Sequence, residues 1–194
     1  MRNILLGLIM CMPLSAEAVM VSLLPSSTDI HVGDVFSVDI VADIGAMEPV
    51  LGWGLDIQNP SGLLTQTAAP VIGSDWFPAS GLDGDGLAGL AFPMPVTGND
   101  ILLASLTYEA IATGVATLMP SYTLGDFTEG FPLAPPNIGF ADIDFTGVSL
   151  LIQDRVISVP EPGTALTILL GLVGMGFFTR ETQKCIYVYR DPFS

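Results

Sequence analysis

Basic residues are scarce in this sequence. Its 194 residues contain 5 Lys and Arg against 20 Asp and Glu, for a formal charge of −15. Binding to a phosphate backbone depends on Lys and Arg, so we expect no nucleic-acid partner. Histidine is equally rare. His31 is the only one, and it precedes a Val-Gly-Asp turn, so we interpret it as a solvated turn residue rather than a catalytic base.

Cysteine is nearly absent as well. Cys11 lies near the start of the chain and Cys185 near its end, which leaves none in between. A disulfide framework or a thiolate metal site is therefore excluded from the central part. With no paired histidines and no HExxH motif, zinc is not expected either. The central part must be held together by a hydrophobic core, and half of the sequence is hydrophobic.

The negative charge is concentrated between residues 19 and 159. This span holds sixteen acidic residues and one basic residue, Arg155, so it accounts for the whole −15. The remaining four basic residues flank two hydrophobic segments, one near each end of the chain. The sequence therefore predicts an acidic central domain, residues 19–158, between two segments of a different kind.

The first hydrophobic segment, residues 1–18, has the pattern of a secretory signal peptide. Arg2 precedes an apolar run over 4–12, which is too short to span a bilayer. Ala16 and Ala18 then form a small-residue cleavage site. We predict cleavage after Ala18, which leaves Val19 as the mature N-terminus. A lipoprotein signal, with Cys11 as the first mature residue, is the alternative.

The second hydrophobic segment follows two prolines. The stretch Val159-Pro160-Glu161-Pro162-Gly163 interrupts any continuous strand or helix. An uncharged run over 163–179 comes next and is closed by Arg180 and Lys184. Seventeen residues can just cross a thin bilayer, and the basic residues would remain cytoplasmic. We predict a transmembrane helix over 163–179 and a short cytoplasmic tail over 185–194.

These three parts, in this order over residues 159–184, resemble the PEP-CTERM sorting signal of Gram-negative bacteria, a tail also labelled ice-binding protein C-terminal domain. The resemblance implies export, transient anchoring in the inner membrane, and processing near the motif by an exosortase-type protease. It further implies a final location at the cell surface or outside the cell, and a link with extracellular polysaccharide and biofilm. The sequence ETQKCIYVYRDPFS after Arg180 departs from the pattern and leaves open whether the tail is cleaved.

Period-two alternation predicts strands in the central domain. One set places Phe36, Val38, Ile40 and Ala42 on a single face, and a second does the same for Leu51, Trp53, Leu55 and Ile57. Further sets are Leu102, Ala104, Leu106, Tyr108 and Ala110, then Ala141, Ile143 and Phe145, and a last strand is expected over 148–159. Short strands separated by turn residues indicate an all-β fold, an antiparallel β-sandwich.

The order of these strands resembles cohesin-like domains of bacterial surface and cellulosome proteins. The resemblance rests on a Val32-Gly33-Asp34 turn before an alternating strand, on the Gly- and Trp-containing stretch 51–56, and on the strands over 97–108 and 114–118. It implies a jelly-roll sandwich whose work is noncovalent recognition, of a dockerin-type partner in cellulosomes. No partner-binding residue is carried over.

Three groups of residues are candidates for other chemistry. Asp83 and Asp85, in a Gly-rich turn, can offer hard oxygen ligands to Ca²⁺, although the EF-hand pattern fails after Gly86. We expect no other cofactor. Asp142 and Asp144 are two apart on a strand and could serve glycoside hydrolysis. Trp76 and Phe77 could stack on sugar rings, and burial against the core is the preferred interpretation.

The sequence thus predicts an exported, noncatalytic protein that recognises a protein or a polysaccharide. A secreted glycan-active enzyme and a purely structural anchored protein are the alternatives.

Overall fold

The computed structural model describes residues 18–79, 87–155, 163, 167–170 and 172. The chain divides after Arg155 into two units, and the first contains all of the strands formed by these residues. These are β1 (Val19–Pro25), β2 (Ile30–His31), β3 (Val35–Ile44), β4 (Gly52–Gly54), β5 (Asp56–Gln58), β6 (Leu64–Gln66), β7 (Val71–Ile72), β8 (Phe77–Pro78), β9 (Ala88–Leu90), β10 (Gly98–Ala110), β11 (Gly114–Ser121), β12 (Ile143–Thr146) and β13 (Val148–Gln153).

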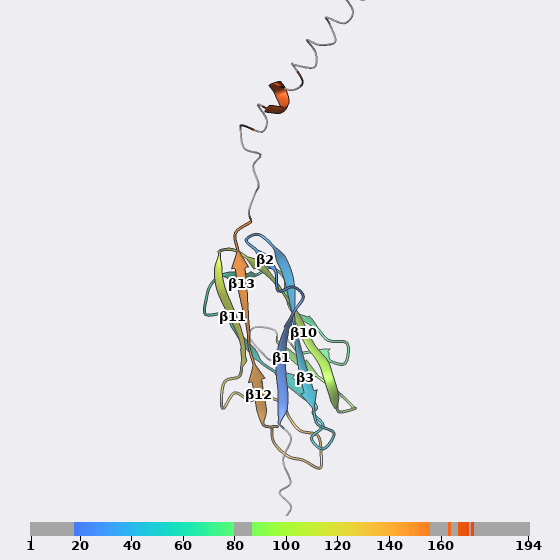
Figure 1. Cartoon of the computed structure of the whole chain (residues 1–194). Helices are drawn as coiled ribbons and strands as arrows, with labels where there is room; N and C mark the ends of the chain where they lie inside the picture. The colour runs from blue at the N-terminus through green and yellow to red at the C-terminus, as the bar shows by residue number, and fades with distance from the viewer. Residues whose placement is uncertain (1–17, 80–86, 156–162, 164–166, 171, 173–194) are drawn as a thin grey trace, which may run out of the picture. The chain divides into compact units, whose positions relative to one another are not determined.

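The longest strands form one sheet in the order β12-β1-β3-β10-β6, and β7 also pairs with β10. Figure 1 shows β12, β1, β3 and β10 as neighbours in this layer. Strand β3 lies in the middle of this sheet, and from Phe36 onward its side chains alternate between buried and half-buried positions. Phe36, Val38, Ile40 and Ala42 face the core, which confirms the prediction for this strand.

The second layer is made of two shorter sheets. One has the order β2-β13-β11-β5 and the other the order β4-β9-β8. Leu55 lies between β4 and β5, and its N–H donates to the Leu87 carbonyl at 3.1 Å. This bond extends the pairing of β4 with β9 as far as the start of β5, so the two sheets are joined through residues 52–58.

The core lies between the layers and draws side chains from both. Val21, Ile40 and Leu106 come from the first sheet, and Leu118 and Ile152 come from the second. All five are at most 2% exposed. Each fully buried aliphatic side chain contributes about 1.5–3 kcal/mol. This burial stabilises the packing of the two layers on each other.

The sandwich is not wholly antiparallel. Strand β12 runs parallel to β1, and β13 runs parallel to β2, whereas the other pairs are antiparallel. The chain passes from the first layer to the second between β12 and β13. Gly147 makes this crossing possible, because a Cβ there would lie 2.8 Å from the Leu118 carbonyl oxygen. The last strand ends at Gln153, earlier than the predicted 148–159.

The alternation predicted for 102–110 fails at its first residue. Leu102 is 36% exposed, whereas its neighbour Leu103 is fully buried. The register of β10 against β3 shifts between Leu102 and Ala104, which marks a β-bulge. An extra residue in one strand reverses the facing of the side chains before it, and strict alternation resumes from Ala104.

The single buried face predicted for residues 51–57 is only partly present in the structure. Trp53 and Leu55 are buried, whereas Leu51 and Ile57 are only half-buried. Gly52 and Gly54 are buried too, so both faces of β4 are covered. The reason is that β4 and β5 pair with different partners, β9 and β11.

The second unit, from Val156 onward, is described at a few residues only. Gly163, 167–170 and Leu172 are helical, and the Thr167 hydroxyl donates to the Gly163 carbonyl at 2.8 Å. Within these described residues no helix is long and apolar enough to cross a membrane. Most of the predicted helix 163–179 lies outside the described residues.

Candidate functional site

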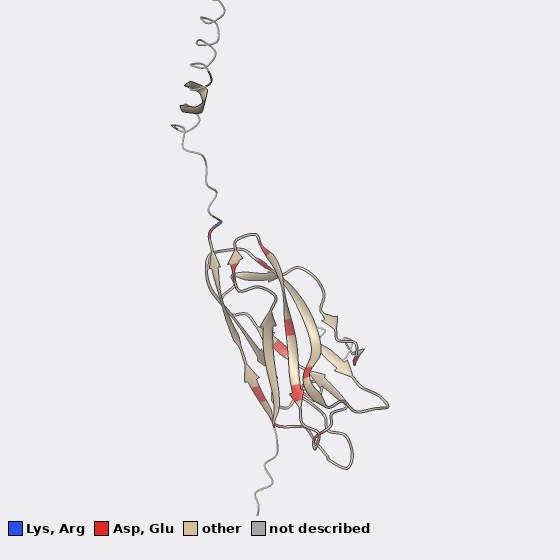
Figure 2. Ribbon diagram, turned by 45° about the vertical axis from the view of Figure 1, so that its right-hand side comes forward, with Lys and Arg blue, Asp and Glu red and all other residues tan. Residues whose placement is uncertain are grey.

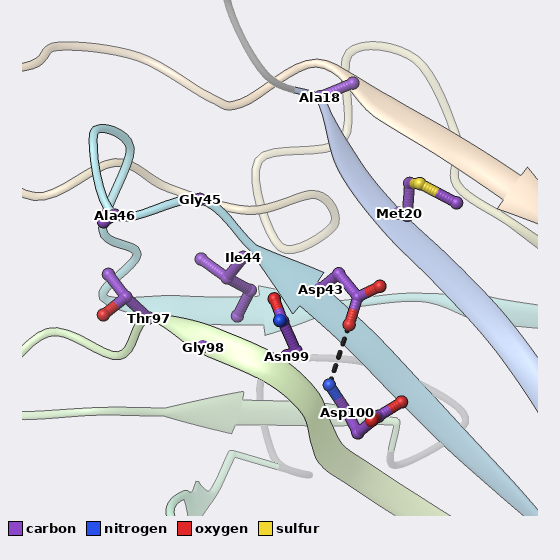
Figure 3. Close-up of a pocket in the computed structure, with 10 residues that line it drawn as sticks. All are labelled: Ala18, Met20, Asp43, Ile44, Gly45, Ala46, Thr97, Gly98, Asn99 and Asp100. Atoms are coloured by element: carbon purple, nitrogen blue, oxygen red, sulfur yellow. Dashed lines mark hydrogen bonds between the residues drawn. The ribbon is translucent and has the colours of Figure 1, made fainter.

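A hollow of about 480 Å³ lies where three strand ends meet. Figure 3 shows Ala18 and Met20 from the start of β1, Asp43 from the end of β3, and Asp100 from the start of β10. Predicted cleavage after Ala18 would remove one of its lining residues.

One of the two carboxylates that line this hollow, that of Asp43, has a structural task. The Asp43 side chain accepts a hydrogen bond of 2.7 Å from the Asp100 backbone N–H (Figure 3). Asp100 has a φ of 53°, the left-handed region that Asp tolerates better than most residues. The bond therefore holds the irregular start of β10 against β3. Among the described residues, no group of three acidic, His or Cys side chains is arranged to hold a metal ion.

A second hollow, about 270 Å³, is built by the loop after β11 and the approach to β12. Its lining includes the aromatic residues Tyr122, Phe127 and Phe140 and the acidic residues Asp126, Glu129 and Asp142. Phe127 is 86% exposed, although burying a Phe side chain is favourable. An aromatic side chain held in water on an ordered loop is typical of a contact surface.

Hydrogen bonds within this loop fix the acidic residues. The Asp126 carboxylate accepts bonds from the Thr128 hydroxyl at 2.7 Å and from the Thr128 N–H at 2.9 Å. These bonds, the hydroxyl first, hold the pKa of Asp126 below its ordinary value. Glu129 is the only buried charged side chain in the described domain, and its Oε2 accepts a bond from the Thr123 N–H.

A third hollow, about 110 Å³, adjoins the second. The two share Phe127, Gly130 and Phe140 in their linings. The third also borders β9 through Ala88 and Leu90. We call the two hollows together the aromatic groove, with Phe127 and Phe140 at the junction. It runs from the loop after β11 to the outer side of the β4-β9-β8 sheet.

The chain beside this groove is seated closely on β4. Gly54 and Gly130 exchange two backbone hydrogen bonds, of 3.0 and 2.8 Å, so the loop pairs with the free edge of β4. A Cβ at Gly54 would lie 2.1 Å from the Thr128 carbonyl oxygen, a distance that forces the loop away. Glycine is therefore required at Gly54 for the loop to approach. Phe131 anchors the same segment because its side chain is fully buried.

Two tryptophans support the groove from inside the domain. The Trp53 and Trp76 rings meet edge to face, with centroids 6.3 Å apart. The Trp76 indole N–H donates to the Leu102 carbonyl at 3.0 Å, and the Trp53 indole N–H is buried without a partner. Trp76 is thus a core residue, as preferred, whereas Phe77 is 67% exposed.

The structure separates several residues that the sequence suggested as sites. His31 is half-buried, and its Nδ1 lies 3.6 Å from an oxygen of Asp34. Asp142 and Asp144 are both exposed, but only Asp142 lines one of the three hollows. The acidic positions are spread over strands and loops rather than gathered into one patch (Figure 2).

Other predicted sites lie outside the described residues. These are Ala16, the calcium candidates Asp83 and Asp85, the motif residues Val159, Pro160, Glu161 and Pro162, and the basic residues Arg180 and Lys184. Sequence reasoning did not find the groove. A signal existed in the run 122–140, where five large hydrophobic residues that the structure exposes occur without a strand or helix period: Tyr122, Leu124, Phe127, Ile138 and Phe140.

Comparison with known proteins identifies the fold. No family model matches this chain, and no curated protein matches it. Among solved structures, the cohesin module of a family 33 glycoside hydrolase from Clostridium perfringens matches with a TM-score of 0.55 at 8% identity, covering 71% of this chain and 98% of the module.

Two further structures agree. The seventh ScaB type I cohesin from Pseudobacteroides cellulosolvens has a TM-score of 0.53 at 14% identity, covering 73% of this chain and 96% of its own. A non-cellulosomal cohesin from the hyperthermophilic archaeon Archaeoglobus fulgidus has a TM-score of 0.50 at 12% identity, with coverages of 72% and 94%. At such identities the likeness concerns the fold alone. The domain therefore has a mostly-β, cohesin-like fold.

Proposed function

We propose that this protein is an exported, noncatalytic recognition module that binds a protein or a polysaccharide through the aromatic groove. The observation that carries the proposal is the exposure of Phe127 and Phe140 at the junction of two hollows on a cohesin-like fold. Aromatic side chains supply most of the contact energy in many interfaces, and they also stack on sugar rings. The resemblance to cohesin-like domains implies noncovalent recognition as well.

The architecture around the groove supports this proposal. Gly130 pairs with Gly54 and Phe131 is anchored in the core, so the chain that follows Phe127 is held by the sandwich. A preorganised loop binds with a smaller loss of conformational entropy than a loop that orders on contact. Leu90 of β9 extends the apolar surface beyond the loop.

We also propose that the segment over 159–184 sorts the protein. In this proposal an exosortase-type protease processes the chain near Val159-Pro160-Glu161-Pro162-Gly163 after transient anchoring in the inner membrane by 163–179. The processed protein is then located at the cell surface or outside the cell. The order of motif, apolar run and basic residues in the sequence supports this route.

The binding proposal is tested with the purified full chain in mild detergent. The extracellular proteins and the extracellular polysaccharide of the producing cells are fractionated and titrated separately against it. A photo-crosslinking residue at position 127 then identifies what touches the groove, and the identified molecule is purified and titrated again. We expect saturable binding that weakens at least tenfold in the double variant Phe127→Ser, Phe140→Ser.

A matched control is Leu24→Ser. Leu24 is 51% exposed on β1, in the first sheet, so the change removes exposed apolar surface without touching the groove. It should bind like the wild-type protein. The proposal is wrong if neither fraction binds saturably, or if the double variant binds as well as the control.

A further inference from the structure

Glu129 is unusual in the described domain because it is a charged residue that is only 7% exposed. Burial of a carboxylate is costly unless hydrogen bonds or a cation compensate it. Oε2 accepts the Thr123 N–H. Oε1 accepts no hydrogen bond from another residue of the described structure. It is nevertheless not fully enclosed, because the only side-chain N or O atom among the described residues that is both fully buried and unpaired is Trp53 Nε1. Glu129 lines the second hollow, so its unpaired carboxylate oxygen is within reach of a group that enters there.

No cation of the described domain compensates this carboxylate. Arg155 is the only Lys or Arg among the described residues, and its guanidinium pairs with Asp34. Asp126 and Asp142 line the same hollow and add further negative charge. The Thr128 hydrogen bonds keep Asp126 ionised, because they lower its pKa. The hollow is therefore complementary to a positively charged group from outside the domain.

The lining also defines what kind of cation fits. A bare Ca²⁺ prefers six to eight oxygen ligands, and much of this hollow is aromatic and aliphatic. Its volume of about 270 Å³ is just below the roughly 300–1,000 Å³ of pockets that enclose a small molecule. The space suits one long side chain rather than a cofactor.

We propose that the second hollow receives an arginine side chain of a protein partner, with Glu129 Oε1 as acceptor and Phe127 or Phe140 stacked on the guanidinium. A guanidinium is planar, bonds carboxylates with paired N–H groups and stacks on aromatic faces, which an ammonium does less well. The inference rests on the proposed function and narrows it to a protein ligand. The charge of −15 steers such a basic partner toward the domain.

The test uses the full chain, labelled with ¹⁵N and held in mild detergent. The probes are the Nα-acetyl amides of arginine, lysine and citrulline, where citrulline is a neutral isostere of arginine. Amide shifts of Thr123, Asp126 and Thr128 report on the hollow. We expect saturable shifts with arginine in the millimolar range, weaker binding of lysine, and no saturable shifts with citrulline.

Two variants separate binding from folding. Glu129→Gln removes the charge but keeps an oxygen to accept the Thr123 N–H, and we expect at least a tenfold loss of arginine affinity. Phe127→Leu removes a ring at an exposed position and should weaken binding about threefold or more. Asp29→Asn, which removes a charge from an exposed turn between β1 and β2, should change nothing. Unchanged spectra elsewhere in the domain show that each variant is folded.

The outcomes distinguish this inference from the proposed function. Equal binding of arginine and citrulline, or an unchanged affinity in Glu129→Gln, overturns the inference. If a partner crosslinked at position 127 also binds Glu129→Gln with full affinity, the arginine assignment fails while the recognition function stands. If arginine binds as expected but neither extracellular fraction binds, the second hollow is an arginine-binding site and the proposed recognition function is wrong.

Discussion

The carboxylate of Asp34 joins the turn before β3 to the end of the domain. Its Oδ1 accepts a hydrogen bond of 2.5 Å from the Arg155 guanidinium, and its Oδ2 accepts the His31 N–H at 2.8 Å. The pKa of Asp34 lies below its ordinary value, chiefly because of the His31 N–H and then because of Arg155, while desolvation acts in the opposite direction. Asp34 thus closes the parallel pair of β2 and β13 at its end.

Replacement of Asp34 by Asn should lower the melting temperature at neutral pH by a few degrees. A carboxylate whose pKa is lower in the folded than in the unfolded protein stabilises the fold. This stabilisation is complete at pH values above the ordinary pKa of 3.8, and it is lost as the pH falls through the pKa of the folded state. The difference between wild type and variant should therefore persist down to pH 3.8 and narrow only below it. Melting curves of the full chain between pH 2 and 7 measure this. Arg155→Gln should have the smaller effect, and the reverse order would contradict the ranking of the two interactions.

The bulge in β10 gives a second prediction. Leu103→Ala should lower the free energy of unfolding by about 2–5 kcal/mol, because Leu103 is fully buried. Leu102→Ala should cost about 1 kcal/mol or less, since that side chain reaches solvent. Urea unfolding of both variants measures the difference. A larger loss for Leu102 than for Leu103 would support uninterrupted alternation and refute the bulge.

These two leucines also show how far sequence reasoning reaches. The face of β3 was predictable because Ser37 and Asp39 separate the apolar residues Phe36, Val38 and Ile40, so only one register buries the apolar set. Leu102 and Leu103 are identical in chemistry, and the choice between them depends on pairing with β3, which is distant in sequence. The parallel pairing of β12 with β1 is a long-range feature of the same kind.

Which rings of the aromatic groove are exposed could not be predicted, for a related reason. Its loop has no period, so hydrophobicity alone does not distinguish Phe127, which is exposed, from Phe131, which is buried. The difference in burial comes from the pairing of Gly130 with Gly54, because this pairing sets the direction of the chain between Phe127 and Phe131.

Phe127 and Phe131 therefore make a matched pair. Phe131→Ala should lower the free energy of unfolding by about 3–5 kcal/mol, because it leaves a cavity in the core. Phe127→Ala should change it by about 0.5 kcal/mol or less and still weaken binding to the groove. Thermal unfolding and titration with the crosslinked partner measure the two effects. A large loss of stability in Phe127→Ala would mean that this ring serves folding rather than recognition.

Calcium binding by Asp83 and Asp85 stays a prediction, because both residues lie outside the described part of the chain. Extracellular modules commonly bind Ca²⁺ with dissociation constants of about 0.1–1 mM. Calorimetric titration of the full chain should give heat in that range, and Ca²⁺ should raise the melting temperature. The double variant Asp83→Asn, Asp85→Asn should lose both effects. Absence of heat and of any shift at millimolar Ca²⁺ in the wild type would rule the site out.

The sorting proposal predicts the ends of the mature protein. Material released from the cell surface should begin at Val19 and end near Pro160 to Gly163, because the signal peptidase cuts after Ala18 and the exosortase-type protease cuts near the motif. Intact-mass measurement and N-terminal sequencing establish both ends. Pro160→Ala combined with Pro162→Ala should leave the protein bound to the cell, whereas Asp29→Asn should be released normally.

Two outcomes would contradict these ends. A mature protein that starts at Cys11 would indicate a lipoprotein. A released chain that still contains Arg180 would contradict cleavage at the motif.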